Sequence, residues 1–168
     1  MARAPSLTLF LAPLDGSIGG YAHDAGELDD LIQLFTERGT EEWETQVIDA
    51  ECTALFSAGK SGLSGSEMFA LADGITPANE AAIYYLLSEV GNRYDRADDL
   101  IDEADDLSIV EGTAEDYAEE MIDQIYDVPK GLRPYIDTRA FGRDLEMGGD
   151  IAVFDYDGQS YVVTNPHG

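Results

Sequence analysis

The chemistry that this sequence can offer is concentrated in carboxylates between residues 95 and 127. A row of carboxylates can complement a basic protein surface, and a suitably spaced pair can act in acid–base catalysis. The stretch holds fourteen of the 35 Asp and Glu residues and a single base, Arg96. The fourteen acids are Asp95, Asp98, Asp99, Asp102, Glu103, Asp105, Asp106, Glu111, Glu115, Asp116, Glu119, Glu120, Asp123 and Asp127.

The spacing of these acids predicts two helices, each with a charged side and an apolar side. Leu100, Ile101 and Ala104 fall opposite the acids of the first helix, and the second repeats the arrangement. Like charges four residues apart destabilise a helix by about a few tenths of a kcal/mol per pair. Because almost no Lys or Arg relieves this repulsion, the pattern favours a functional surface over an ordinary solvated helix face.

The overall charge excludes two classes of partner. The chain has 168 residues, 9 Lys and Arg, and a formal net charge of −26, whereas nucleic acids and anionic membranes attract basic clusters. Hydrophobic residues make up 44% of the chain, enough to build cores. Adaptation to high salt would also explain acidity and the presence of only Lys60 and Lys130. That explanation predicts acids spread over the whole chain, but residues 52–94 hold only four.

The density of charge suits the mimicry of DNA. B-DNA carries about one negative charge per 1.7 Å of axis, so the 26 net charges correspond to roughly 44 Å, or ~13 base pairs. We therefore expect the carboxylates to occupy the basic groove of a DNA-binding protein. A hydrolase with a carboxylate pair stays as an alternative, although the acids fall on exposed helices rather than on strand ends lining a cleft.

Other motifs lack the residues that their chemistry needs. Gly59–Ser61 resembles the end of a phosphate-binding loop but lacks its first glycine, and Asp155–Gly158 begins like a calcium loop without the later Glu. His23 and His167 have no second ligand at zinc spacing, and Cys52 has no base beside it. We expect no catalytic residue, no metal and no cofactor.

Local patterns predict a mixed α+β chain. A strand over 7–11, a helix from Asp24 to Gly39 and a strand over 43–47 form a small N-terminal unit, and the Gly/Ser-rich residues 58–66 are expected to be a linker. Further helices are expected to begin near Ser64 or Ser66, at Thr76-Pro77, near Arg93, at Thr113 and at Thr138. The helix from Thr113 is expected to bury Tyr117, Met121, Ile122 and Ile125. A hairpin over 151–164 is expected to turn at Asp157-Gly158. No stretch approaches the ~20 apolar residues of a membrane span, so a cytoplasmic protein is expected.

Residues 128–151 resemble a known family. The run YIDTRAFGRDLEMGGDI, over residues 135–151, is similar to the antirestriction motif of the ArdA family. Weaker similarities are the opening strand, Glu42-Trp43 before a second strand, and the acidic helical middle. The motif positions carried over to this chain are Tyr135, Ile136, Asp137, Phe141, Arg143, Asp144 and Leu145.

This resemblance implies a DNA mimic that blocks Type I restriction-modification enzymes in a bacterial host by binding the methyltransferase core without catalysis. It implies an elongated chain of three small domains, here 1–58 (α+β), 59–110 (helical) and 111–168 (α+β with the hairpin), that dimerises through its C-terminal part. Tyr135, Ile136, Phe141 and Leu145 are expected to pack inside, and Arg143 to form an internal ion pair or a dimer contact. The alternative is an acidic mimic that inhibits another DNA-binding defence or nucleoid protein.

Overall fold

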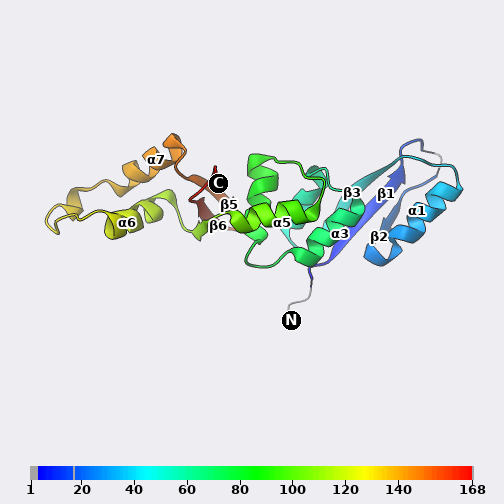
Figure 1. Ribbon diagram of the computed structural model, residues 1–168, viewed down its shortest axis with the longest axis horizontal. Coiled ribbons are helices and arrows are strands. Elements are labelled where there is room, and N and C mark those ends of the chain that lie inside the picture. Colours follow the sequence, from blue (N-terminus) through cyan, green and yellow to red (C-terminus); the bar gives the residue numbers. More distant parts are fainter. Residues whose placement is uncertain (1–3, 17, 168) are drawn as a thin grey trace. The chain divides into compact units, whose positions relative to one another are not determined.

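The computed structural model describes residues 4–16 and 18–167 and confirms the α+β class. The chain divides into two compact units, residues 1–104 and 105–168, which are described separately below (Figure 1). The division into three domains at residues 58 and 110 stays a prediction.

The first unit is built on a three-stranded antiparallel sheet with the order β2-β1-β3. Strand β1 spans Leu7–Pro13, β2 spans Tyr21–His23 and β3 spans Trp43–Ala50. Every second residue of β1 is buried, as the alternation of a half-exposed strand predicts. Strand β2 was not predicted from the sequence; it is only three residues long and pairs with residues 9–11 of β1.

Helix α1 (Leu28–Glu37) covers this sheet together with α3 (Gly65–Gly74) (Figure 1). Its start follows the predicted capping box, in which Asp24 accepts from backbone N–H groups and Glu27 accepts from the N–H of Asp24. The box closes a 3₁₀ turn, η1 (Ala25–Glu27), that leads directly into α1. The core beneath consists of Leu11, Leu28 and Phe35, with Trp43 and Phe69 among the residues packed against it.

Short helices complete the first unit. They are α2 (Thr53–Ser57), the 3₁₀ turn η2 (Ala58–Lys60), α3, α4 (Glu80–Tyr84), the π-helical η3 (Tyr85–Val90) and α5 (Ala97–Asp106). The helix expected at Thr76-Pro77 begins at Glu80 instead, because the side chain of Asn79 accepts from the N–H of Thr76 and holds a turn first. The helix expected near Arg93 begins at Ala97, and α2 was not predicted.

The prediction of a linker at residues 58–66 is wrong. Ala58, Ser61, Leu63 and Gly65 are all buried, and the segment enters α3 through the cap formed by the Ser64 hydroxyl. Small residues here allow close packing instead of providing freedom, so composition alone misleads.

The second unit pairs a small antiparallel sheet with two helices. The sheet has the order β4-β6-β5, from β4 (Ile109–Glu111), β5 (Ala152–Tyr156) and β6 (Gln159–Val163). The predicted hairpin turn is confirmed, since Asp157 and Gly158 both have positive φ angles, of 49° and 80°. Strand β4 was not predicted, because three residues carry too little alternation to be recognised.

Helices α6 (Ala114–Ile125) and α7 (Thr138–Gly148) of the second unit pack side by side (Figure 1). The 3₁₀ turn η4 (Arg133–Tyr135) lies in the connection between them. Ala118 and Ile122 of α6 are buried. The predicted burial of Ile125 is wrong, because that side chain is 65% exposed, while Tyr117 and Met121 are half-buried.

The close approach of α7 to α6 depends on Gly142. A Cβ atom at this position would overlap the carbonyl oxygen of Ala114 and lie 2.6 Å from its carbonyl carbon. Backbone atoms cannot move aside as a flexible side chain can, so this helix contact tolerates no side chain.

We expect Gly142→Ala to destabilise the second unit by about 1–3 kcal/mol, despite the better helix propensity of Ala, because the added methyl group forces the helices apart. Amide hydrogen exchange in α6 and α7 measures the change. Gly148→Ala, on the same helix, is the matched control, because its nearest neighbour is the movable carboxylate of Asp150 at 3.2 Å. Equal exchange in the two variants would contradict the proposed clash.

Candidate partner-binding surface

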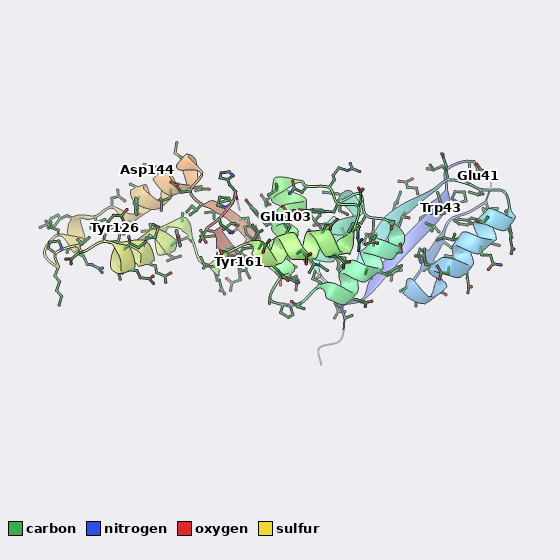
Figure 2. All side chains as sticks on the ribbon, in the orientation of Figure 1. Glu41, Trp43, Glu103, Tyr126, Asp144 and Tyr161 are labelled. Carbon is green, nitrogen blue, oxygen red and sulfur yellow. The ribbon has the colours of Figure 1, made fainter. Side chains whose placement is uncertain are left out.

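All fourteen predicted carboxylate residues are exposed. In the first unit they lie on the loop before α5 and along that helix, where Glu103 is labelled in Figure 2. In the second unit they lie on the end of α5, on β4, along α6 and just after it. The structure therefore places each of them where a partner can reach it, and it buries the opposite sides of both helices.

The start of α5 is held by a contact that sequence reasoning missed. The N–H of Ala97 donates to the Glu67 carboxylate at 2.7 Å, and Glu67 lies on α3, thirty residues earlier. A carboxylate at a helix N-terminus satisfies a free donor and interacts favourably with the helix dipole. Local spacing contains no signal for this contact, because the capping residue comes from a different helix.

The start of α6 is capped locally. The hydroxyl of Thr113 accepts from the N–H of Asp116, and the Asp116 carboxylate accepts from both the hydroxyl and the N–H of Thr113. The hydrogen bond from the Thr113 side chain, then that from its backbone, lowers the pKa of Asp116 below its ordinary value of 3.8. Asp116 is thus both a surface charge and a structural cap.

Few of these carboxylates are neutralised within the protein. The described chain contains two ion pairs, Arg96–Asp98 and Arg133–Asp123, of which the first is largely exposed and the second a little under half exposed. The hydrogen bond and charge of Asp98 raise the pKa of Arg96, which remains a cation. Eight of the fourteen form no side-chain hydrogen bond or ion pair among the described residues: Asp95, Asp99, Asp102, Asp105, Asp106, Glu111, Glu119 and Asp127. Of these, Asp99 still interacts through its charge with Arg96.

The positions of some acids oppose helix stability. Acids in the first turns of α5 and α6 suit the positive end of the helix dipole, but Asp105 and Asp106 lie at the negative end of α5. No base lies in the last turn of either helix. Folding alone would favour Lys or Arg there, so the retention of carboxylates points to a role outside the fold.

The residues of the antirestriction motif lie at the end of η4, in the two residues that follow it, and in α7. Asp137 caps α7 by accepting from the N–H of Ala140 at 2.9 Å, and the ring of Phe141 meets that of Tyr126 edge-on. Ile136, Phe141 and Leu145 are half-buried, whereas Asp144 is exposed.

Two expectations for the motif are wrong in part. Tyr135 is 84% exposed, so it is not a packing residue of this chain. Arg143 is exposed and makes no ion pair with any residue that the structure describes, so the expected internal pair is not formed. Tyr135 is the last residue of η4, a turn in which no residue is buried.

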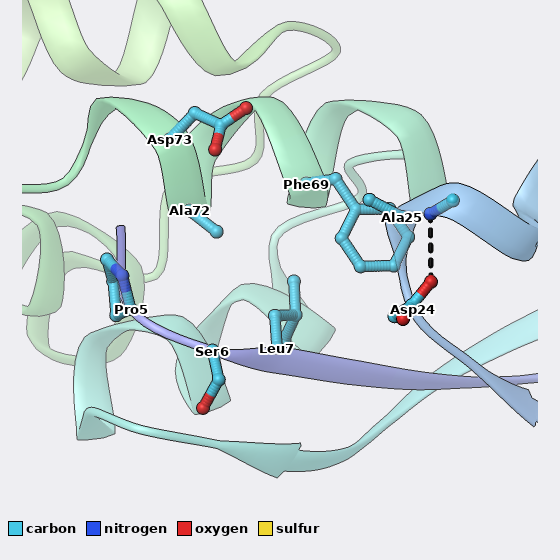
Figure 3. A pocket seen from close by; sticks show the side chains of 9 residues that line it. Pro5, Ser6, Leu7, Asp24, Ala25, Phe69, Ala72 and Asp73 are labelled. Atoms are coloured by element: carbon cyan, nitrogen blue, oxygen red, sulfur yellow. Dashed lines mark hydrogen bonds between the residues drawn. The ribbon is translucent and has the colours of Figure 1, made fainter. Parts of the chain in front are cut away.

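Surface hollows in the first unit offer little for catalysis. Figure 3 shows one of about 460 Å³, in which Asp24 and Asp73 are the charged lining residues and Asp24 is engaged in capping η1. Another, of about 430 Å³, contains Cys52, whose pKa burial raises above 9.0, so the thiol is protonated at neutral pH. Among the described residues, no three His, Cys, Asp or Glu are grouped as metal ligands.

The chain matches the family model described as antirestriction protein (ArdA) over residues 20–159. The chain belongs to the ArdA family. The matched region includes both acidic helices and the whole antirestriction motif, so an antirestriction role, directed at restriction-modification enzymes, applies to the part that carries the surface. No curated protein sequence matches the chain. No helix in the described part of this ArdA protein is long and apolar enough to cross a membrane.

The cap at Thr113 predicts a pH-dependent loss of stability. Thr113→Val should destabilise the second unit by about 1 kcal/mol, the usual cost of losing an N-cap. It should also bring the pKa of Asp116 closer to 3.8. Because folding lowers this pKa, the contribution of Asp116 is present above pH 3.8 and is lost as the pH falls through the folded value.

Urea unfolding at pH 7 and at pH 2.5 tests this expectation. The difference between wild type and Thr113→Val should shrink at the lower pH, and Thr113→Ser, which keeps the hydroxyl, should resemble wild type at both. A difference that is equal at the two pH values would show that the carboxylate contributes nothing.

Proposed function

We propose that this ArdA-family chain is a DNA mimic that inhibits Type I restriction-modification enzymes by occupying the DNA-binding groove of their methyltransferase core. The observation that carries the proposal is the exposure of fourteen carboxylates, eight of which form no side-chain hydrogen bond or ion pair among the described residues. A groove that binds DNA presents Lys and Arg toward phosphates, and carboxylates on helix surfaces can meet the same cations.

Inhibition of this kind needs no catalysis. The protein occupies a site, and no bond is made or broken, so we propose that it has neither catalytic residues nor a cofactor. The target cuts DNA inside the cell, and the proposed site of action is therefore the cytoplasm of the bacterial host. Acidic mimicry also suits other DNA-binding defence or nucleoid proteins, and the competition experiment below includes one of them.

The experiment measures displacement of a fluorescent DNA duplex from a Type I methyltransferase. Wild type should displace it, and less effectively as salt rises, because exposed charges are screened over about 8–10 Å at physiological ionic strength. The triple variant Asp99→Asn, Asp102→Asn, Glu119→Gln removes three charges that form no side-chain hydrogen bond or ion pair among the described residues. Each lost exposed pair costs about 0.2–1 kcal/mol, so displacement should weaken roughly three- to a hundredfold.

The matched control makes the same charge change elsewhere. Asp29→Asn, Asp30→Asn, Glu41→Gln removes three exposed acids from outside residues 95–127, and its displacement should fall less than that of the first variant. Circular dichroism checks that both fold. Equal losses would contradict the assigned surface, and displacement only from an unrelated nucleoid protein would favour the alternative target.

We also propose that the chain forms a homodimer through its C-terminal part, including the antirestriction motif. Several large apolar side chains are exposed at the end of α6 and in the connection to α7, namely Ile125, Tyr126, Leu132 and Tyr135. Four of the nine bases lie close to them in sequence: Lys130, Arg133, Arg139 and Arg143. Bases are poorly suited to a basic groove, so this region fits a second copy of the chain better.

Sedimentation velocity tests the dimer. We expect wild type to sediment as a dimer at micromolar concentration and Tyr135→Asp to sediment as a monomer, because burying an added charge opposes association. Leu14→Asp, which changes an equally apolar side chain that is 60% exposed in the first unit, should leave the dimer intact. A wild type that is monomeric, or equal loss in both variants, would contradict this interface.

A further inference from the structure

One carboxylate of α5 is held differently from its neighbours. Both oxygens of Glu103 accept hydrogen bonds: Oε2 from the Tyr94 hydroxyl at 2.9 Å and Oε1 from the Asn92 amide at 3.2 Å. The same amide also donates to the Tyr94 hydroxyl oxygen at 3.2 Å, so the three side chains form a closed set. Asp102, on the same helix, has no side-chain partner among the described residues.

The two donors are themselves fixed by the fold. The ring of Tyr94 is buried, with 8% of the residue exposed. Its backbone N–H donates to the carbonyl of Ser61 at 2.9 Å, and that of Asn92 donates to the carbonyl of Leu86 at 3.0 Å. Because Ser61 is also buried, the loop before α5 is anchored at both donors and provides a rigid support for them.

The protonation state of the phenol supports a constant donor. Burial, followed by the hydrogen bond and charge of Glu103, raises the pKa of Tyr94 to about 12, while the Asn92 amide lowers it. The hydroxyl therefore keeps its proton at every pH at which restriction enzymes work. A carboxylate has about four acceptor sites, so two accepted bonds leave room on each oxygen for a cation.

We propose that Tyr94 and Asn92 are positioning residues, which hold the exposed Glu103 carboxylate in one orientation so that it meets a basic side chain of the partner already ordered. The inference rests on the proposed function. A free Glu side chain loses rotamer freedom when it forms an ion pair. At an exposed site this loss of entropy offsets much of the favourable electrostatic energy of the pair. Because folding already orders the Glu103 side chain, this entropy is not lost on binding. Glu103 therefore contributes more to the affinity for the partner than neighbouring carboxylates that are not held in place.

Displacement of DNA from the methyltransferase by Tyr94→Phe, in three backgrounds, tests the positioning role. The change keeps the buried ring and removes the hydroxyl. It should weaken displacement about two- to fivefold in wild type and in the Asp102→Ala control, in which Glu103 is still present. In the Glu103→Ala background it should have no further effect, because the carboxylate it positions is gone.

An equal loss in all three backgrounds would overturn the inference, because Tyr94 would then act through the general stability of the unit. No loss in wild type would overturn it as well. If wild type displaced no DNA, the proposed function would fail, and the partner role of Glu103 with it. Urea unfolding, followed by the single tryptophan Trp43, would still test the network. If the effects of Tyr94→Phe and Glu103→Ala on the free energy of unfolding were not additive, the two side chains would interact and Tyr94 would still be a positioning residue for Glu103. Additive effects would exclude that role.

Discussion

Repulsion among carboxylates is the constraint on which the rest of this structure depends. A net charge of −26 on 168 residues opposes compaction, and only two ion pairs in the described chain relieve it. The fold is stable because each unit buries its own apolar core, around Leu11 and Phe35 in the first and around Phe154 and Val162 in the second. Burial keeps the acids outside, where water screens them from one another.

Some carboxylates stabilise the helices that other carboxylates destabilise. Asp24 caps the turn before α1, Glu67 caps α5, and Asp116 completes the box that starts α6. In all three, the charge lies at a helix N-terminus, where free N–H groups and the helix dipole favour an anion. The carboxylates along the middle and the C-terminal ends of α5 and α6 cap no helix, and all of them are exposed.

Features that depend on residues close together in the chain could be predicted from the sequence, and features that depend on distant residues could not. The Asp24–Glu27 box and the Asp157-Gly158 turn were predicted correctly because each depends on residues fewer than five positions apart. The packed segment at residues 58–66 and the exposure of Tyr135 were not, because burial is set by elements that meet from elsewhere in the chain. Strand β4 is recognisable only through its pairing with β6, about fifty residues later.

The amino-acid sequence by itself determined the charge, its clustering between residues 95 and 127, the α+β class and the motif of the ArdA family, because these depend on composition and short spacing. Only the tertiary structure decided which of these carboxylates are committed to other side chains. Glu103 is held by Tyr94 and Asn92, Asp123 pairs with Arg133, and Asp102 has no side-chain partner among the described residues. The physical reason is that a hydrogen bond requires two groups to lie within about 3 Å, and packing, not sequence spacing, brings such groups together.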